Sequence, residues 1–88
     1  MIIGQVINSV WCTRKEDSLI GMKLLIVKLL DSQNNDNSRN IVAVDLIGAG
    51  IGERVLITQG SSARQSLGSD EAPIDSIIIG IIDEKAEL

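Results

Sequence analysis

Two segments of this chain are strand-like in composition and apolar in nearly every position. They are MKLLIVKLL at residues 22–30 and SIIIGIID at residues 76–83. A strand with one face in water alternates apolar and polar residues, whereas these segments would be apolar on both faces. Helices could cover the outer face, but the chain has almost no helical segment to supply them. Because large exposed apolar patches are rare on monomers, we expect another chain to cover the outward residues, in an obligate oligomer.

Five strand-like runs follow one another along the chain, separated by turn-rich segments. Branched aliphatic residues fill these runs, as suits pleated strands, and the spacing predicts an all-β barrel or sandwich. With 88 residues, the chain is expected to form a single domain, residues 1–88. The polar segment 31–40 is expected to be a solvent-facing loop, and 61–67 is the only helical candidate. The expected strands are 2–11, 22–30, 41–46, 53–58 and 76–83.

Charge and composition argue against several classes of function. The net charge is −4, whereas a nucleic-acid surface needs basic patches that displace counterions. Trp11 is the only aromatic residue, whereas proteins that bind single-stranded nucleic acid stack aromatic side chains on successive bases. The charge disfavours anionic lipid, and no segment has the length of a membrane span or the pattern of a signal peptide. Neither nucleic acid nor a membrane is therefore an expected partner.

The single cysteine and the absence of histidine limit the chemistry of the chain. They rule out an internal disulfide and a mixed zinc site. Cys12 is expected to be a reduced thiol, buried like a small hydrophobic residue. The acidic residues are scattered singly, without the dense spacing of a calcium loop.

GAGIG, at residues 48–52, has three alternating glycines, a pattern that raises the possibility of phosphate binding. The spacing differs from the dinucleotide fingerprint, a strand-like run follows instead of a helix, and no P-loop lysine is present. We therefore expect a tight connection, whose glycines allow positive φ or a close approach of backbones between subunits.

GSSARQS, at residues 60–66, could belong to a catalytic site, an anion site or a structural contact. Without histidine, Ser61 and Ser62 cannot belong to a Ser-His-Asp triad, and nothing in the spacing supports a Ser-Lys pair. Arg64 could hold an anion at a short helix N-terminus, but pairing with a carboxylate that fixes a turn or an interface is favoured. No catalytic residue, metal site or cofactor is expected.

An ordered set of motifs runs through nearly the whole chain. The most specific of them is Gly60-Ser61-Ser62-Ala63-Arg64-Gln65. The others are Gly4 and Val6, Thr13-Arg14-Lys15, Gly21-x-Lys23-Leu24-Leu25, Ala43-Val44-Asp45, Gly48-Ala49-Gly50-x-Gly52-Glu53, Val55-Leu56, Pro73-Ile74-Asp75 and Ile79-Gly80-Ile81-Ile82-Asp83. In this order and spacing, the sequence resembles the bacterial microcompartment vertex protein family, of the EutN/CcmL type. Some members of that family carry a longer extension after the last strand than the Glu84-Lys85-Ala86-Glu87-Leu88 ending seen here.

The resemblance implies a five-stranded OB-like β-barrel, here with one short helix, that assembles into a cyclic pentamer. Such pentamers occupy the five-fold vertices of a polyhedral microcompartment shell within the cytoplasm and close it. The implied partners are other copies of this chain and the hexameric and pseudo-hexameric proteins of the shell. The implied role is structural, without enzymatic activity. The positions implied at a subunit interface or an axial pore are Gly48, Ala49, Gly50, Glu53, Gly60, Ser61, Ser62 and Arg64.

Two functions of other classes are alternatives. A small OB-like binding module for an anionic ligand or nucleic acid would predict a basic groove and a monomer or dimer. An enzyme with an unusual metal or Ser-Lys site would predict a cluster of carboxylates. The acidic composition speaks against the first, and the scattered acids and missing histidine speak against the second.

Overall fold

The computed structural model describes residues 1–12, 15, 17–30, 39–60, 63 and 74–83. It contains all five predicted strands, with ends close to those expected, so the all-β prediction is confirmed. Segments rich in β-branched residues form these strands because such side chains pack well on a pleated surface. The elements are β1 (Ile2–Ser9), a 3₁₀ helix η1 (Asp17–Leu19), β2 (Lys23–Leu29), β3 (Asn40–Asp45), β4 (Arg54–Gln59) and β5 (Ser76–Ile81).

The helical content differs from the expectation. The segment between β1 and β2 contains η1, although 61–67 was the only predicted helix. In η1 the backbone N–H of Ile20 donates to the carbonyl of Asp17, at 3.2 Å. A helix of three residues is too short to leave a periodic pattern in the sequence. Within 61–67, Ala63 is described and has helical backbone, while the rest of the predicted helix lies outside the described residues. Residues 31–38 of the loop predicted at 31–40 also lie outside the described residues.

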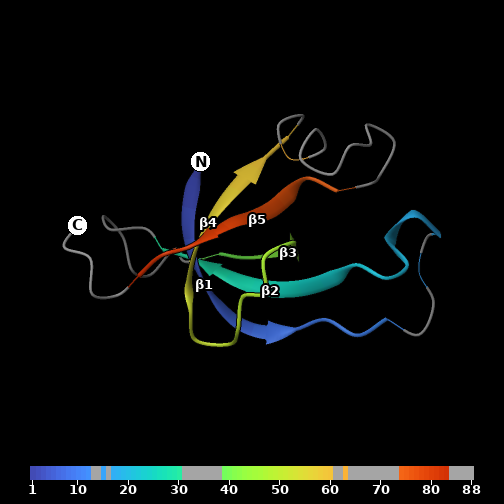
Figure 1. The fold of residues 1–88 in the computed structure, drawn as a ribbon, viewed down its shortest axis with the longest axis horizontal. Coiled ribbons are helices and arrows are strands. Elements are labelled where there is room, and N and C mark those ends of the chain that lie inside the picture. The colour runs from blue at the N-terminus through green and yellow to red at the C-terminus, as the bar shows by residue number, and fades with distance from the viewer. Residues whose placement is uncertain (13–14, 16, 31–38, 61–62, 64–73, 84–88) are drawn as a thin grey trace.

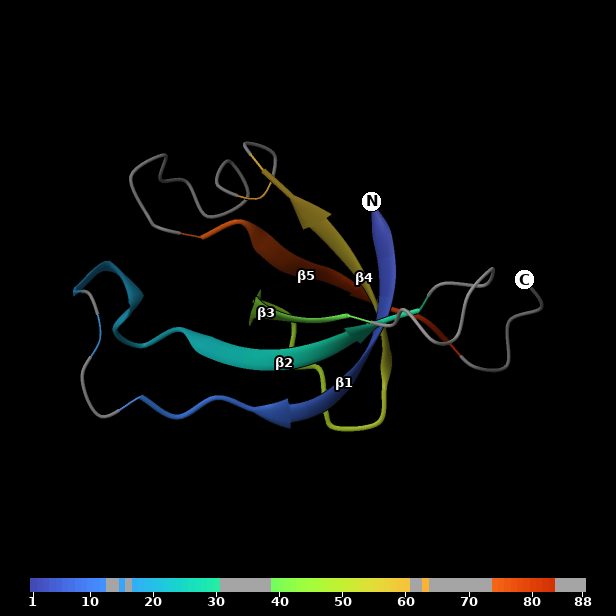
Figure 2. The same ribbon diagram turned by 180° about the vertical axis from the view of Figure 1, so that it is seen from behind.

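The five strands close into a barrel in the order β1-β2-β3-β5-β4. Four of the five contacts between neighbouring strands are antiparallel. The fifth, between β3 and β5, is parallel and consists of the pairs Val44–Ile77 and Asp45–Ile78. Two opposite views show β3 between β2 and β5 (Figures 1 and 2). The described residues between β1 and β2 lie at the end of the molecule farthest from the end of β5 (Figure 1).

The interior of the barrel is filled by aliphatic side chains from all five strands. Val27, Val55, Ile57 and Ile78 are completely shielded from solvent. Ile2, Leu29 and Ile41 pack against this cluster at its margin. The remaining buried members are Val6, Leu25, Ala43 and Ala49.

A second apolar cluster lies on the outer side of the barrel wall. Successive residues of a strand point to opposite faces, so Ala43 belongs to the interior and Val44 to the second cluster. On β5, Ile78 likewise belongs to the interior and Ile77 to the second cluster. The second cluster also contains Ala63 and Ile74, with Leu19, Met22, Leu24 and Ile79 packed against it. Residues from the connections thus cover part of the outer face. The expectation that another chain covers the outward apolar residues therefore applies to those that stay exposed in the single chain.

Many other outward apolar side chains stay exposed in the single chain. Val42 is 52% exposed and Ile51 is 68% exposed. Among the described residues, the other large apolar ones that are exposed are Met1, Ile3, Ile7, Trp11, Ile20, Leu30, Leu46, Ile47 and Ile81. Outward apolar side chains of this kind are available for contact with another chain.

Cys12 lies beyond the end of β1 and is exposed, next to Trp11. The expectation of a buried thiol was therefore wrong, because the strand ends before this residue and the barrel cannot shield it. In the part of the chain that the structure describes, no helix has the length and apolarity to cross a bilayer. The same described ranges contain no cluster of three or more metal-ligating side chains.

Gly4 is required by the packing of the barrel interior. It pairs with Leu29 on β2 and with Val55 on β4. A Cβ atom at this position would overlap Cγ1 of Val27 and would lie 3.0 Å from the carbonyl oxygen of Lys28. Any side chain here would push β1 away from β2.

We predict that Gly4→Ala lowers the free energy of unfolding by about 1–3 kcal/mol, the usual cost of overpacking a core. Urea unfolding at a fixed protein concentration measures it. The matched control is the same substitution in a Val27→Ala background, where the main overlap is gone and the added cost should be smaller. An equal cost in both backgrounds would show that the overlap with Val27 is not the cause.

Candidate subunit interface

The carboxylate of Asp45, at the end of β3, organises the loop that leads to β4. Its Oδ1 accepts hydrogen bonds from the backbone N–H groups of Ile47 and Gly48, both at 3.1 Å. Its Oδ2 accepts a third from the N–H of Ala49, at 2.8 Å. The side chain of Asp45 is fully shielded from solvent. An aspartate in such a position holds the backbone of the following residues in a turn.

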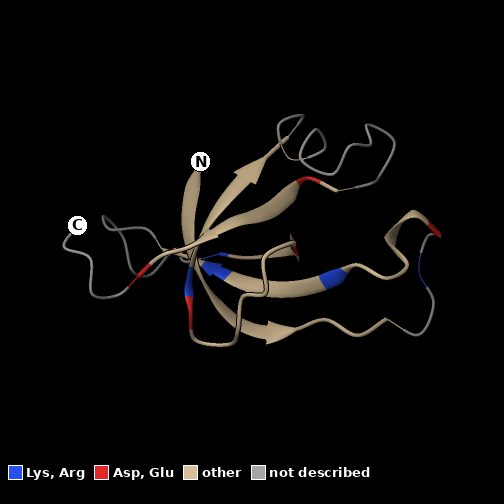
Figure 3. Ribbon diagram, in the orientation of Figure 1, with Lys and Arg blue, Asp and Glu red and all other residues tan. Residues whose placement is uncertain are grey.

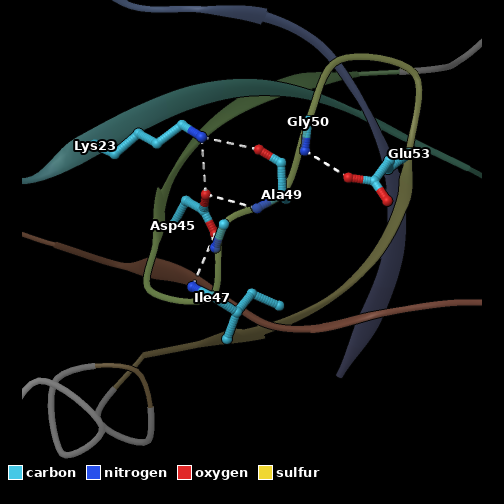
Figure 4. Close-up of polar contacts among 7 residues, drawn as sticks. Lys23, Asp45, Ile47, Ala49, Gly50 and Glu53 are labelled. Atoms are coloured by element: carbon cyan, nitrogen blue, oxygen red, sulfur yellow. Dashed lines mark hydrogen bonds and ion pairs between the residues drawn. The ribbon is translucent and has the colours of Figure 1, made fainter.

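Lys23, the first residue of β2, completes this arrangement. It is the register partner of Asp45, and its Nζ lies 3.3 Å from Oδ2 of that residue. The same ammonium donates a hydrogen bond to the carbonyl of Ala49, at 2.9 Å. Both backbone groups of Ala49 are therefore satisfied, and its methyl group is buried in the barrel interior. Figure 4 shows Lys23, Asp45 and Ala49 converging on one point.

The second half of the loop is fixed by hydrogen bonds to β1 and by a carboxylate. Oε1 of Glu53 accepts from the N–H of Gly50 at 2.7 Å, which the close-up also shows (Figure 4). The N–H of Gly52 donates to the carbonyl of Val6 at 2.8 Å, and the N–H of Val6 donates to the carbonyl of Glu53 at 3.0 Å. Nε2 of Gln5 donates to the carbonyl of Gly52 at 3.1 Å. We call residues 46–53 the glycine loop.

Two glycines of this loop have backbone conformations that other residues rarely adopt. The φ angle is 89° at Gly48 and 92° at Gly52. A side chain at either position would be strained, by roughly 1–2 kcal/mol. The loop is followed by β4 and not by a helix. The interpretation of the GAGIG segment as a tight connection with positive φ is thus confirmed.

The glycine loop presents three large apolar side chains to solvent from a firmly held backbone. Leu46 and Ile47 are 49% and 43% exposed, and Ile51 is 68% exposed. The carboxylates of Asp45, just before the loop, and of Glu53, at its end, accept from backbone N–H groups, and that of Asp45 also pairs with Lys23. The arrangement is suited to contact with an apolar protein surface, because little conformational freedom remains to be lost on binding.

The predicted site residues fall into two places. Gly48, Ala49, Gly50 and Glu53 are brought together in the glycine loop, before β4, whereas Gly60 directly follows β4. These two sites therefore lie at opposite ends of the strand. Ser61, Ser62 and Arg64 lie outside the described residues, so their predicted roles stay predictions.

Gly60 and Ala63 form a turn at the far end of β4. The φ angle of Gly60 is 70°, and its N–H donates to the carbonyl of Asp75 at 2.9 Å. The N–H of Ala63 donates to the carbonyl of Gly60 at 3.1 Å. Ala63 is completely buried in the second apolar cluster. Gly60 and Ala63 therefore each have a structural reason to be small.

Comparison with known families assigns the chain. The family model described as "Ethanolamine utilisation protein EutN/carboxysome" matches residues 1–83. The chain belongs to the EutN/CcmL family. The resemblance drawn from the ordered motifs is therefore confirmed.

The relatives of this EutN/CcmL chain are shell vertex proteins. It is 43% identical over 83 residues to the carboxysome shell vertex protein CcmL of Gloeobacter violaceus, covering 94% of this chain and 83% of the relative. It is 46% identical over 83 residues to the microcompartment shell vertex protein GrpN of Rhodospirillum rubrum, covering 94% and 93%. The solved structure described as the pentameric microcompartment shell protein GrpN covers all of both chains, with a TM-score of 0.81 and 40% identity.

Sequence reasoning on this family member missed the pairing of Lys23 with Asp45. Both residues appear in the matching motifs, but the acidic residues were considered only as ligands of a calcium loop and as partners of Arg64. A signal was available, because an aspartate at a strand end, followed by a turn with glycine, commonly caps the backbone that follows. The partner Lys23 could not be identified from spacing, because β2 and β3 are joined by their register and not by sequence proximity.

Asp45→Ala should lower the free energy of unfolding by about 3–5 kcal/mol, because it leaves three backbone N–H groups without their acceptor and removes the carboxylate that pairs with Lys23. Lys23→Met is the comparison. The lysine side chain is 52% exposed, and Asp45 keeps its backbone donors, so the cost should be about 1 kcal/mol. Urea unfolding of both variants tests whether Asp45→Ala loses more stability than Lys23→Met. Equal costs would mean that the ion pair, and not the backbone hydrogen bonds, holds the loop.

Proposed function

We propose that this chain is the vertex subunit of a bacterial microcompartment shell, a structure within the cytoplasm, and that it works as a cyclic pentamer. The observation that carries the proposal is the full-length match to the pentameric shell protein GrpN, at 40% identity. The exposed apolar side chains of the single chain support it independently. A ring in which each subunit contacts the next covers such surfaces without leaving open ends.

The proposed work of the pentamer is geometric. A layer of hexagonal units is flat, and pentagons introduce the curvature that closes it into a polyhedron. The partners of the ring in this proposal are hexameric and pseudo-hexameric shell proteins at its rim. This role needs a rigid subunit with stable contacts, and the closed barrel with its anchored glycine loop supplies rigidity.

We place the glycine loop in the contact between subunits. Gly48, Ala49, Gly50 and Glu53 give the loop its shape through positive φ, burial and hydrogen bonds. The exposed side chains of Leu46, Ile47 and Ile51 would then make the contact. For Gly60, Ser61, Ser62 and Arg64, at the other end of β4, a role at an interface or at the axial pore remains our proposal.

The role that we propose is structural and not catalytic. The curated relatives CcmL and GrpN are named as shell vertex proteins. The carboxylates of Asp45 and Glu53, which hold the glycine loop, serve as hydrogen-bond acceptors for its backbone. They therefore act as anchors of the fold and need no substrate or cofactor to explain them.

Native mass spectrometry at several protein concentrations tests the assembly. The wild-type chain should give a five-subunit species. Ile51→Asp should weaken the ring by about 100-fold in dissociation constant, since a charge replaces a buried contact side chain.

The matched control is Ile20→Asp, which changes a similarly exposed isoleucine, 65% against 68%, in the connection between β1 and β2. It should leave the ring intact. A wild-type chain that remains monomeric at all concentrations would overturn the proposed function. A pentamer that tolerates Ile51→Asp as well as Ile20→Asp would remove the glycine loop from the interface.

A further inference from the structure

A row of polar and basic residues crosses the outer wall of the barrel over four strands. Gln5 on β1 is the register partner of Lys28 on β2 and of Arg54 on β4. Lys28 is also the register partner of Asn40, the first residue of β3, and Arg39 directly precedes Asn40. We call these five positions, Arg54, Gln5, Lys28, Asn40 and Arg39, the cationic row.

The cationic row faces solvent, because the adjacent residues of its strands face the barrel interior. Val27 and Leu29, on either side of Lys28, lie in the interior cluster or pack against it. Val55, the residue after Arg54, also belongs to that cluster. All three basic residues of the row are exposed. Figure 3 shows them at the ends of β2, β3 and β4 that lie away from the connection between β1 and β2.

The positive charge of the row is not balanced by the carboxylates that the structure describes. Glu53 directly precedes Arg54, but its Oε1 accepts from the N–H of Gly50. Asp45 pairs with Lys23, which begins β2, whereas the row crosses β2 near its end. Within the described ranges, none of the three cations of the row forms an ion pair. In a chain of net charge −4, this gathering of cations favours an anionic partner at one place on the surface.

The spacing and the side-chain types of the row fit an extended peptide with carboxylates. Neighbouring strands lie about 4.8 Å apart, so the backbones of Lys28 and Arg54, on either side of β1, are about 10 Å apart. In an extended segment, side chains two residues apart point to one face at a separation of about 7 Å. Long basic side chains can span the difference, and a guanidinium binds a carboxylate with two N–H groups. The exposed amide of Asn40 offers a donor and an acceptor to the peptide backbone.

Two features favour a protein segment over a nucleic acid. The net charge of −4 repels a dense polyanion at a distance. Single-stranded nucleic acids are bound by stacking on aromatic side chains. Trp11, the only aromatic residue, lies in the connection before β2, whereas Lys28 lies near the end of that strand. A short acidic segment carries fewer charges and needs no stacking platform.

We propose that the cationic row is a docking site for an acidic, extended segment of another protein, whose carboxylates are bound by Lys28 and Arg54. The inference does not rest on the proposed pentamer, since the row is complete on a single barrel. It gives the subunit a binding function in addition to assembly.

Fluorescence anisotropy with a labelled peptide tests the docking site on the full chain. The probe alternates glutamate and alanine over about ten residues, which is long enough to cross the row. The wild type should bind this peptide, and it should bind a peptide with glutamine in place of glutamate at least about 10-fold more weakly, because the charge-assisted hydrogen bonds are lost. Binding should also weaken as salt is raised, because ions screen exposed charges.

A double variant and a matched control separate the row from the overall charge. Lys28→Gln combined with Arg54→Gln should raise the Kd of the acidic peptide by about 10-fold or more. The control is Lys15→Glu, in the connection between β1 and β2, which lowers the net charge by the same amount away from the row. It should change the Kd by less than about 3-fold, since exposed charges farther away than a Debye length are screened. Circular dichroism checks that both variants remain folded.

Four results would overturn the proposal. The first is a wild type that does not bind the acidic peptide. The second is an equal loss of affinity in the double variant and in Lys15→Glu, which would show a response to net charge alone. The third is tighter binding of single-stranded DNA of the same length than of the peptide. The fourth is a double variant that loses the assembly of the wild type in native mass spectrometry, which would place the row in the subunit contact instead. A monomeric wild type that binds the peptide through the row would contradict the proposed pentamer and support the docking site.

Discussion

The buried carboxylate of Asp45 is the group on which the shape of the glycine loop depends. It joins three backbone N–H groups and the ammonium of Lys23 at the point where β3 ends. A buried charge is tolerated only when it is well compensated, and here the compensation itself shapes the loop. The apolar side chains of the glycine loop are exposed because the backbone beneath them cannot move inward to bury them.

The apolar outer face of the barrel is covered by two different means. Near η1, residues of the connections form a second cluster over β3 and β5. Elsewhere on the outer wall, the described residues leave side chains such as Val42 and Ile3 exposed in the single chain. A small domain buries a smaller share of its surface on folding than a large one. Assembly thus replaces the helices that cover the sheet in larger proteins.

The strands and the glycine loop could be predicted from sequence, since both depend on local patterns. Runs of branched aliphatic residues marked β2 and β5, and alternating glycines marked the tight turn at Gly48 and Gly52. The contacts that depend on strand register could not be predicted. Examples are the pairing of Lys23 with Asp45 and the alignment of Ile3, Leu56 and Gly80 across β1, β4 and β5. The exposure of Cys12 was missed for a related reason, because burial depends on where β1 leaves the barrel.

The parallel contact between β3 and β5 has a consequence for the order of folding. The pairs β1–β2, β2–β3 and β4–β5 join strands that are neighbours in sequence, whereas β1–β4 and β3–β5 join strands more than 30 residues apart, and distant contacts form slowly. The barrel therefore closes only when β4 and β5 reach β1 and β3. The half of the glycine loop that Asp45 and Lys23 hold can form together with β2 and β3. Its hydrogen bonds to Val6 on β1 must wait for that closing step.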